Sequence, residues 1–391
     1  MLVAHLLAGL ALAATQAIPT QQLTLELRYD EDDRFPLTRV ASMALGESGV
    51  VYVSDALELS VAILDSTGRV AGTIGREGRG PGEFASIGAI GVFGDTVWAV
   101  DPALRRLLLF DTSGTTRVTI SGQRTDTATW PAFPIETPPE TVLRGAHVTL
   151  AASTSSPQQR NLTLLGVDGR PVLLFAAVDL ARMRLVLRGS RGLAVSTYQP
   201  LDDSPLWASS PDGSRLVVVE REAADSEAGS MSVSARTVSG DLVYRTSCGY
   251  EPVLVPASVK NDIVERAARA NPGISGGAMG AAEDAARQSL YLPTYYTPVD
   301  AVVVAKDNRV WLREHGADHD ATAVWLVLDP SGVPAARILG PALLTIRAAD
   351  GNRAWGTEQD AFGTLHAVRY SVGSGDSVRA AASPWRCSTA P

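Results

Sequence analysis

Short runs of β-branched and aromatic residues recur along the chain, each following a turn and ending in an acidic residue. The clearest is Val51–Asp55, which reads Val-Tyr-Val-Ser-Asp. Runs of this length and composition, bounded by turn residues, predict β-strands. The runs end at Asp55, Asp101, Glu220, Glu314 and Glu358. The repetition predicts an all-β fold in which one small unit is used several times.

A second strand follows the acid in each unit and closes on a tight turn. Residues 61–64 lead into a turn from Asp65 to Gly68, and residues 107–110 lead into a turn from Asp111 to Gly114. Aspartate favours the start of such turns because its carboxylate accepts nearby backbone N–H groups, and glycine adopts the positive φ that the turn requires. Further strands flank this pair, so each unit is predicted to be a four-stranded antiparallel sheet.

The units recur with the spacing of propeller blades, about 40–50 residues. They fall at residues 40–84, 85–125, 140–188, 204–247, 290–339 and 340–372. We predict a six-bladed β-propeller, whose radial packing leaves few open strand edges. Five or seven blades are the alternatives to this count. Residues 23–29 and 364–370 both alternate between apolar and polar positions, so we expect the N-terminal strand to complete the sixth blade.

One region interrupts the strand pattern between the fourth and fifth units. Residues 256–270 are typical of a helix, which the sequence Asn-Pro-Gly at 271–273 ends. A second helical stretch is predicted at 281–288. We therefore expect a helical insertion at about 256–288, between blades four and five. A C-terminal tail, 373–391, follows the last blade.

The N-terminal residues 1–17 are typical of a signal peptide, with an apolar run that is too short to span a bilayer and small residues before Ile18. No lysine or arginine precedes that run, so a start further upstream, or a short hydrophobic element of the fold, is the alternative. We predict an exported protein, periplasmic or extracellular, with residues 18–391 forming one propeller domain. No later apolar stretch reaches about 18 residues, which predicts no transmembrane span in the mature chain.

Two cysteines and the overall charge add to this picture. In an exported protein, Cys248 and Cys387 favour a disulfide that ties the tail to the body. Two separate buried thiols are the alternative. The net charge of −8 provides no basic surface for nucleic acid. We expect a monomer with a protein, peptide or glycan partner.

The segment at 74–84, Ile-Gly-Arg-Glu-Gly-Arg-Gly-Pro-Gly-Glu-Phe, resembles the blade-joining loop of NHL-like and TolB-like six-bladed propellers found in bacterial exported proteins. The resemblance is specific over residues 40–115 and looser over 290–372. It implies six blades but no particular activity, because many such proteins are uncharacterised. In this loop we expect Phe84 to fill the space between neighbouring blades and Glu83 to accept backbone N–H bonds.

The acids that end the second strands are the first candidate site. Carboxylates on one rim can bind a cation or a cationic ligand. Alternatively, each accepts hydrogen bonds from turns of its own blade. The predicted set is Asp55, Asp101, Glu220, Glu314 and Glu358.

A second candidate site is the loop that follows Glu314. His315, Asp318, His319 and Asp320 are side chains of the kind that hold Zn²⁺ or a similar ion. A solvated hairpin loop has the same composition and is the alternative.

These features support two functional hypotheses. The first is a binding or scaffold propeller for a protein, peptide or glycan. The second is a divalent-cation-dependent hydrolase or lyase, because the related six-bladed propellers include lactonases and lyases that hold a cation in the channel. The sequence requires no cofactor, although a divalent cation fits the second hypothesis. Three or more carboxylate, Asn or His side chains meeting on the channel axis would favour the enzyme.

Overall fold

The structure of the chain is a computed structural model. For the residues between 120 and 198 it describes the backbone only. It describes residues 18–29, 37–104, 106–121, 141–144, 147–151, 159–166, 171–179, 184–188, 194–212, 214–224, 226–237, 239–270, 279–315, 322–360, 363–373 and 385–390. The predicted signal peptide at 1–17 lies outside these residues.

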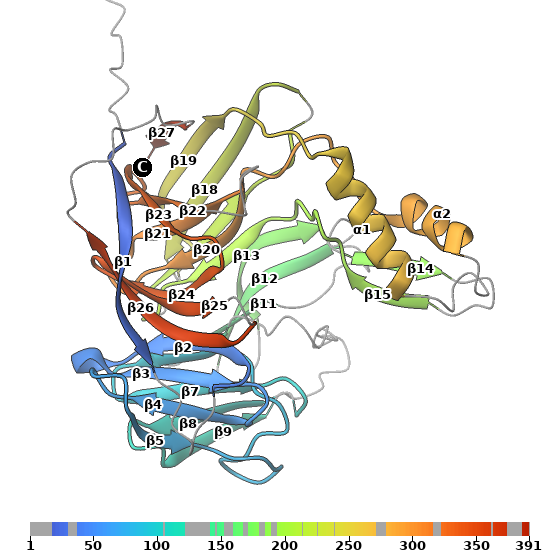
Figure 1. The fold of residues 1–391 in the computed structure, drawn as a ribbon. Coiled ribbons are helices and arrows are strands. Elements are labelled where there is room, and N and C mark those ends of the chain that lie inside the picture. The colour runs from blue at the N-terminus through green and yellow to red at the C-terminus, as the bar shows by residue number, and fades with distance from the viewer. Residues whose placement is uncertain are drawn as a thin grey trace, which may run out of the picture.

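Three antiparallel sheets of four strands form the first half of the chain (Figure 1). The first contains β2 (Val40–Leu45), β3 (Val51–Asp55), β4 (Ser60–Leu64) and β5 (Val70–Ile74). The second contains β6 (Ile90–Phe93), β7 (Thr96–Asp101), β8 (Arg106–Asp111) and β9 (Thr116–Ser121). The third contains β10 (Thr141–Arg144), β11 (His147–Ala151), β12 (Gln159–Gly166) and β13 (Pro171–Asp179).

The second half has larger sheets. One contains β16 (Leu206–Ser209), β17 (Arg215–Glu220), β18 (Gly229–Thr237), β19 (Leu242–Tyr250) and β27 (Arg386–Ala390). Another contains, in spatial order, β20 (Val299–Val304), β21 (Val310–Glu314), β22 (Thr322–Leu328), β23 (Pro334–Pro341), β1 (Thr20–Tyr29), β26 (Leu365–Gly373), β25 (Arg353–Gln359) and β24 (Leu344–Asp350). A separate pair consists of β14 (Arg184–Arg188) and β15 (Ala194–Tyr198).

The N-terminal strand explains why two expected sheets are joined into one. Along most of its length β1 pairs antiparallel with β26, with Leu25 opposite Tyr370, as predicted for the two ends of the chain. Its other edge pairs in parallel with β23, where Thr20 lies opposite Arg337. The fifth strand β27 and the β14–β15 pair also depart from the expected pattern of four strands per sheet.

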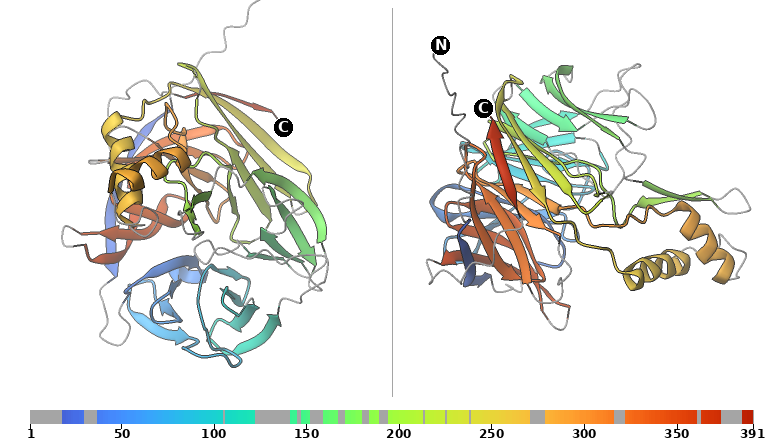
Figure 2. Two further views of the ribbon diagram at one scale, coloured as in Figure 1. Left: turned by 90° about the vertical axis from the view of Figure 1, so that its right-hand side faces the viewer. Right: turned by 90° about the horizontal axis from the view of Figure 1, so that it is seen from above.

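The sheets stand around a common centre (Figure 2). The first strands of neighbouring groups contact one another in the order β16, β20, β24, β2, β6, β10. Four apolar clusters of the described residues lie between successive sheets, and one of them joins residues of β2–β5 with residues of β6–β8. A radial arrangement of small antiparallel sheets that cover each other's apolar faces is typical of a propeller-like fold.

The loop between the first two sheets behaves as its sequence predicts. Phe84 is fully buried in the cluster between these sheets, with its ring centroid 6.0 Å from that of Phe110. Glu83 Oε2 accepts the Gly80 N–H at 2.8 Å. Both expectations for this loop are confirmed.

Two helices, α1 (Ala257–Ala270) and α2 (Met279–Ser289), lie between β19 and β20 in the chain, where helical segments were predicted. They project to one side of the sheets (Figure 2). The side chain of Gln199 connects to the end of α2, because it donates to the Ser289 carbonyl at 3.1 Å and accepts the Tyr291 N–H at 3.0 Å. No helix in the described part of the chain is long and apolar enough to cross a membrane.

A disulfide joins the C-terminal strand to the body. Cys248 of β19 lies opposite Cys387 of β27, and their sulfurs are 2.08 Å apart. The polar segment Arg-Cys-Ser-Thr-Ala is therefore held as an edge strand by a covalent bond in addition to its backbone hydrogen bonds.

Candidate functional site

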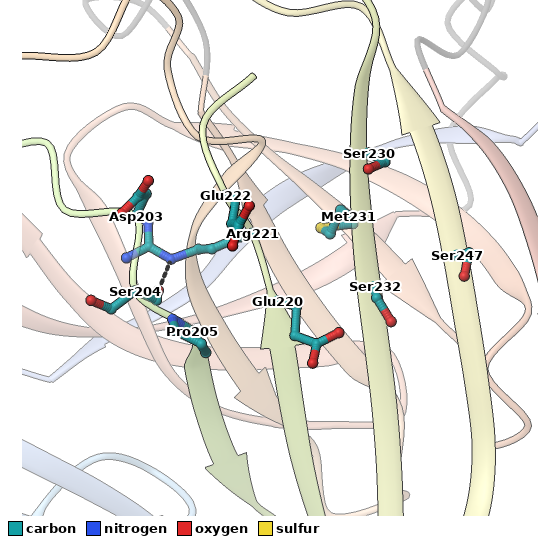
Figure 3. A pocket seen from close by; sticks show the side chains of 10 residues that line it. All are labelled: Asp203, Ser204, Pro205, Glu220, Arg221, Glu222, Ser230, Met231, Ser232 and Ser247. Carbon is teal, nitrogen blue, oxygen red and sulfur yellow. Dashed lines mark hydrogen bonds between the residues drawn. The ribbon is translucent and has the colours of Figure 1, made fainter. Parts of the chain in front are cut away.

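A polar pocket of about 510 Å³ lies at one end of the β16–β19 sheet (Figure 3). Three carboxylates, four serines and one guanidinium are among the groups around it. The lining residues are Asp203, Ser204, Pro205, Glu220, Arg221, Glu222, Ser230, Met231, Ser232 and Ser247.

The strand register places a row of polar side chains along one wall. Glu220, the last residue of β17, lies opposite Ser232 of β18, which in turn lies opposite Ser247 of β19. Residues directly opposite each other on adjacent strands have neighbouring side chains on the same face. Met231 is buried on the other face of β18, as the period-two alternation of a strand requires.

Arg221 is buried beneath the pocket and ties together the segments that lead into β16 and β20. Its Nε donates to the Ser204 carbonyl at 2.8 Å, and its Nη1 donates to Thr297 Oγ1 at 3.1 Å and to the Val299 carbonyl at 3.2 Å. Its Nη2 lies 3.3 Å from Asp202 Oδ2. These bonds hold the floor of the pocket in place.

Burial disfavours both charges of this pair, as shown by their pKa values. Desolvation lowers the pKa of Arg221, although nearby carboxylates, Asp202 first among them, act in the opposite direction. Desolvation likewise raises the pKa of Asp202, against hydrogen bonds from Ser204. A buried pair of this kind depends on both partners, because the loss of either leaves an uncompensated charge.

The wall formed by residues 203–205 is fixed from the opposite side by the segment that follows α2. Tyr291 Oη donates to Asp203 Oδ2 at 2.8 Å. Because Gln199 also contacts this segment, the helices and the pocket share a common support.

Asp55 and Asp101 end strands equivalent to β17 but do not line the pocket. Both side chains are fully buried. Asp55 accepts the backbone N–H groups of Arg39, Leu57 and Glu58 at 2.7, 2.8 and 3.1 Å.

Asp101 is used in the same way in the next sheet. It accepts the N–H groups of Ala85 at 3.0 Å and Leu104 at 3.1 Å. It also lies 3.5 Å from the Nε of Arg106. These hydrogen bonds are those of the alternative interpretation, in which the acid serves the turns of its own sheet.

The remaining two acids in the later sheets are also engaged. Glu314 forms a two-pronged pair with Arg337 at 2.8 and 2.7 Å and accepts the Trp385 indole N–H at 2.8 Å. Glu358 accepts the Tyr370 hydroxyl at 2.9 Å. Burial, together with this carboxylate, raises the pKa of Tyr370. Of the predicted five acids, Glu220 alone lines the pocket.

Only part of the predicted metal loop can be placed. His315 Nδ1 lies 3.2 Å from Thr297 Oγ1, and its ring centroid lies 4.3 Å from that of Tyr296. Asp318, His319 and Asp320 lie outside the described residues. Among the residues that the structure does describe, no group of three or more His, Cys, Asp or Glu side chains could hold a metal ion.

A second, smaller cavity of about 170 Å³ lies where the first strands meet. Residues of β2, β6, β16, β20 and β24 line it, and among the lining residues that the structure describes Arg347 is the only one with a charged side chain. The second hypothesis requires a cation in the central channel, and the positive charge of the Arg347 guanidinium opposes one by electrostatic repulsion.

The sequence interpretation missed Asp203, Arg221, Glu222 and Arg347. The three successive charges at 220–222 directly after a buried strand were an available signal for the pocket. Nothing in the local sequence around Arg347 indicates that it faces a cavity.

No family model matches the chain, and no related sequence was found among curated proteins. Several solved structures of β-propeller-like proteins resemble it. A member of the DUF4221 family from Bacteroides vulgatus has a TM-score of 0.48 and 9% identity, covering 94% of this chain and 98% of its own. A streptogramin B lyase has a TM-score of 0.44 and 12% identity, covering 90% and 98%.

A virginiamycin B lyase from Staphylococcus aureus has a TM-score of 0.43 and 11% identity, covering 89% of this chain and 99% of its own. At these identities and TM-scores the likenesses carry no functional argument. The candidate function therefore depends on the geometry of the pocket.

Proposed function

We propose that the protein binds a cationic ligand, a peptide segment that carries lysine or arginine, in the pocket at the end of the β16–β19 sheet. The observation that carries this proposal is the position of Glu220. The four equivalent acids are hydrogen-bonded or ion-paired within the body, whereas the Glu220 side chain is exposed in a pocket.

The chemistry of the pocket suits an ammonium or guanidinium group. Such groups carry several N–H donors and no acceptor, so they need carboxylates and hydroxyls around them. Glu220 and Glu222 supply negative charge, and Ser232 and Ser247 supply further acceptors. The net charge of −8 adds long-range attraction for cations.

The size of the pocket supports the same class of ligand. Its volume of about 510 Å³ lies within the range of small-ligand sites, about 300–1,000 Å³. A lysine or arginine side chain with its flanking backbone fits this space. Exposed ion pairs contribute modestly, so we expect a dissociation constant on the order of micromolar.

We further propose that the sheets form a closed six-bladed ring, with residues 18–391 as one exported domain. The order of first-strand contacts and the pairing of β1 with β26 support this arrangement. The Cys248–Cys387 disulfide supports an oxidising compartment, since such bonds persist outside the cytosol. The helices would then be an insertion between the fourth and fifth blades.

The test is calorimetric titration with short peptides that contain lysine or arginine, against the same peptides with acetylated lysine or with citrulline. We expect binding of the charged peptides only, with weakening as salt rises. Glu220→Gln should weaken binding about tenfold, the effect of losing one charge-assisted hydrogen bond.

Glu58→Gln is the matched control. Its side chain is exposed in the β3–β4 turn, in a different sheet from the pocket, and the variant makes the same change in charge. Equal weakening by both variants would mean that net charge alone attracts the peptide, and no binding by the wild type would reject the function.

A further inference from the structure

The cavity between the first strands is distinct from the pocket and differs in charge. The described residues that line it are mostly small or apolar, including Ala44, Ile90 and Val302. Ser42, Ser209 and Ser210 are also among the lining residues, although the Ser210 hydroxyl already donates to Asp212 Oδ1 at 2.6 Å. Its volume of about 170 Å³ equals the liquid volume of about six water molecules.

An irregularity in β24 turns Arg347 out of the strand alternation. Ile346 pairs with Gly356, but the next pair is Ala348 with Trp355, so Arg347 is an extra residue with no partner on β25. A bulge of this kind commonly redirects a side chain. The packing agrees, because Ile346 and Ala348, although two residues apart, lie in different apolar clusters.

Arg347 has no ion-pair or hydrogen-bond partner among the described side chains. The charge of Arg313 acts on Arg347, and the Nε and Nη2 of Arg313 already bond both oxygens of Asp300 at 2.5 and 2.9 Å. Arg313 therefore already has a carboxylate partner, whereas no carboxylate among the described residues is paired with Arg347.

The neighbouring strands partly desolvate that cation but leave it reachable from solvent. Burial by the neighbouring strands, and then the charge of Arg313, lower the pKa of Arg347. Its side chain nevertheless remains accessible to solvent within the cavity, so a small molecule can contact it. Arginine stays charged under these conditions, and a charge in such a place is stabilised by an anion.

We propose that the cavity at the centre of the sheets binds a small oxyanion, a carboxylate or phosphate group, through the guanidinium of Arg347. The planar fork of arginine donates two parallel hydrogen bonds to such a group. The serine hydroxyls of β2 and β16 can satisfy its remaining oxygens. This site is independent of the cationic ligand proposed for the pocket.

The test is thermal unfolding of the full chain with malonate or inorganic phosphate, against chloride at equal ionic strength. We expect an increase of about 2 °C or more in Tm at saturating oxyanion. A response to malonate, to phosphate or to both supports the site and identifies the preferred oxyanion. No response to either overturns it.

Two substitutions at the arginine make the result specific. Arg347→Met should abolish the response and leave peptide binding at Glu220 unchanged. Arg347→Lys keeps the charge but loses the fork, so the dissociation constant should rise about tenfold. The lysine variant decides the question if the methionine variant does not fold.

Arg266→Met provides the matched control, since Arg266 is exposed on α1 and the chemical change is the same. It should retain the full response. Loss of the response in this control, or an unchanged response in Arg347→Met, overturns the proposal.

Discussion

The second strand of the β6–β9 sheet and that of the β16–β19 sheet end in the same position but with opposite chemistry. At the end of β7, the Asp101 carboxylate accepts the N–H of Ala85 from the segment leading into β6. At the end of β17, the connection to the segment leading into β16 is made by a donor, the Arg221 guanidinium, which bonds the Ser204 carbonyl. Asp55 at the end of β3 follows the first pattern.

The difference explains why the acid at the end of β17, Glu220, is not bonded to the turns of its own sheet. The short side chain of an aspartate can accept the backbone N–H groups of the residues two and three positions after it. In β17 the acid is a glutamate followed directly by an arginine, and this arginine makes the structural connection in its place. The Glu220 side chain therefore faces the pocket, whereas the four equivalent acids form hydrogen bonds or ion pairs within the body.

The largest expected effect comes from removing the structural acid. Asp101→Ala should lower the free energy of unfolding by about 4 kcal/mol, because it leaves buried backbone donors unsatisfied and Arg106 without its carboxylate. Urea unfolding measures this. By contrast, Glu220→Gln should change stability by less than about 0.5 kcal/mol. Similar losses in both variants would abolish the distinction between the two strand ends.

A smaller loss of stability is expected where Arg221 replaces the acid as the link to the segment leading into β16. Arg221→Met should cost about 3 kcal/mol, because Asp202 is left buried without its partner. Adding Asp202→Asn should recover part of that loss, which a double-mutant cycle measures. If the two substitutions are simply additive, Arg221 does not act through this pair.

The smallest effect concerns the tight turns, which are common to both halves of the comparison. Hydrogen bonds from Ser113 and then Thr115 lower the pKa of Asp111 below its usual 3.8. The folded pKa is the depressed one, so this stabilisation is present above about pH 4 and is lost as the pH falls through the folded value. Asp111→Asn should therefore show a weaker acid dependence of the urea midpoint between neutral pH and pH values below 4. Identical slopes would contradict the assignment.

Sequence patterns were sufficient to predict the repeating strands and turns, because these elements depend on local chemistry. The alternation of residues 23–29 and 364–370 predicted the pairing of β1 with β26. The strand β27 was not predicted, since its polar residues show no apolar alternation and its place depends on a distant cysteine. The added parallel contact with β23 depends on space left beside a neighbouring sheet, which no local pattern records.

The candidate site was less predictable for a related reason. The positions of the five acids follow from the repeat, but their partners depend on neighbouring segments such as Arg39 and Arg337. Whether Glu220 is free depends on what Arg221 does. The direction of Arg347 depends on a bulge, which is a property of pairing between two strands and not of one strand.

The bond between Cys248 and Cys387 closes a covalent loop that contains both helices and all of the strands from β20 to β26. A protease that cuts any peptide bond between these two cysteines would consequently leave a single covalent molecule. Such a clipped form would migrate near full length without reductant and separate into two fragments with it. β1, which is hydrogen-bonded between strands of this loop, would hold the nicked product in its original register.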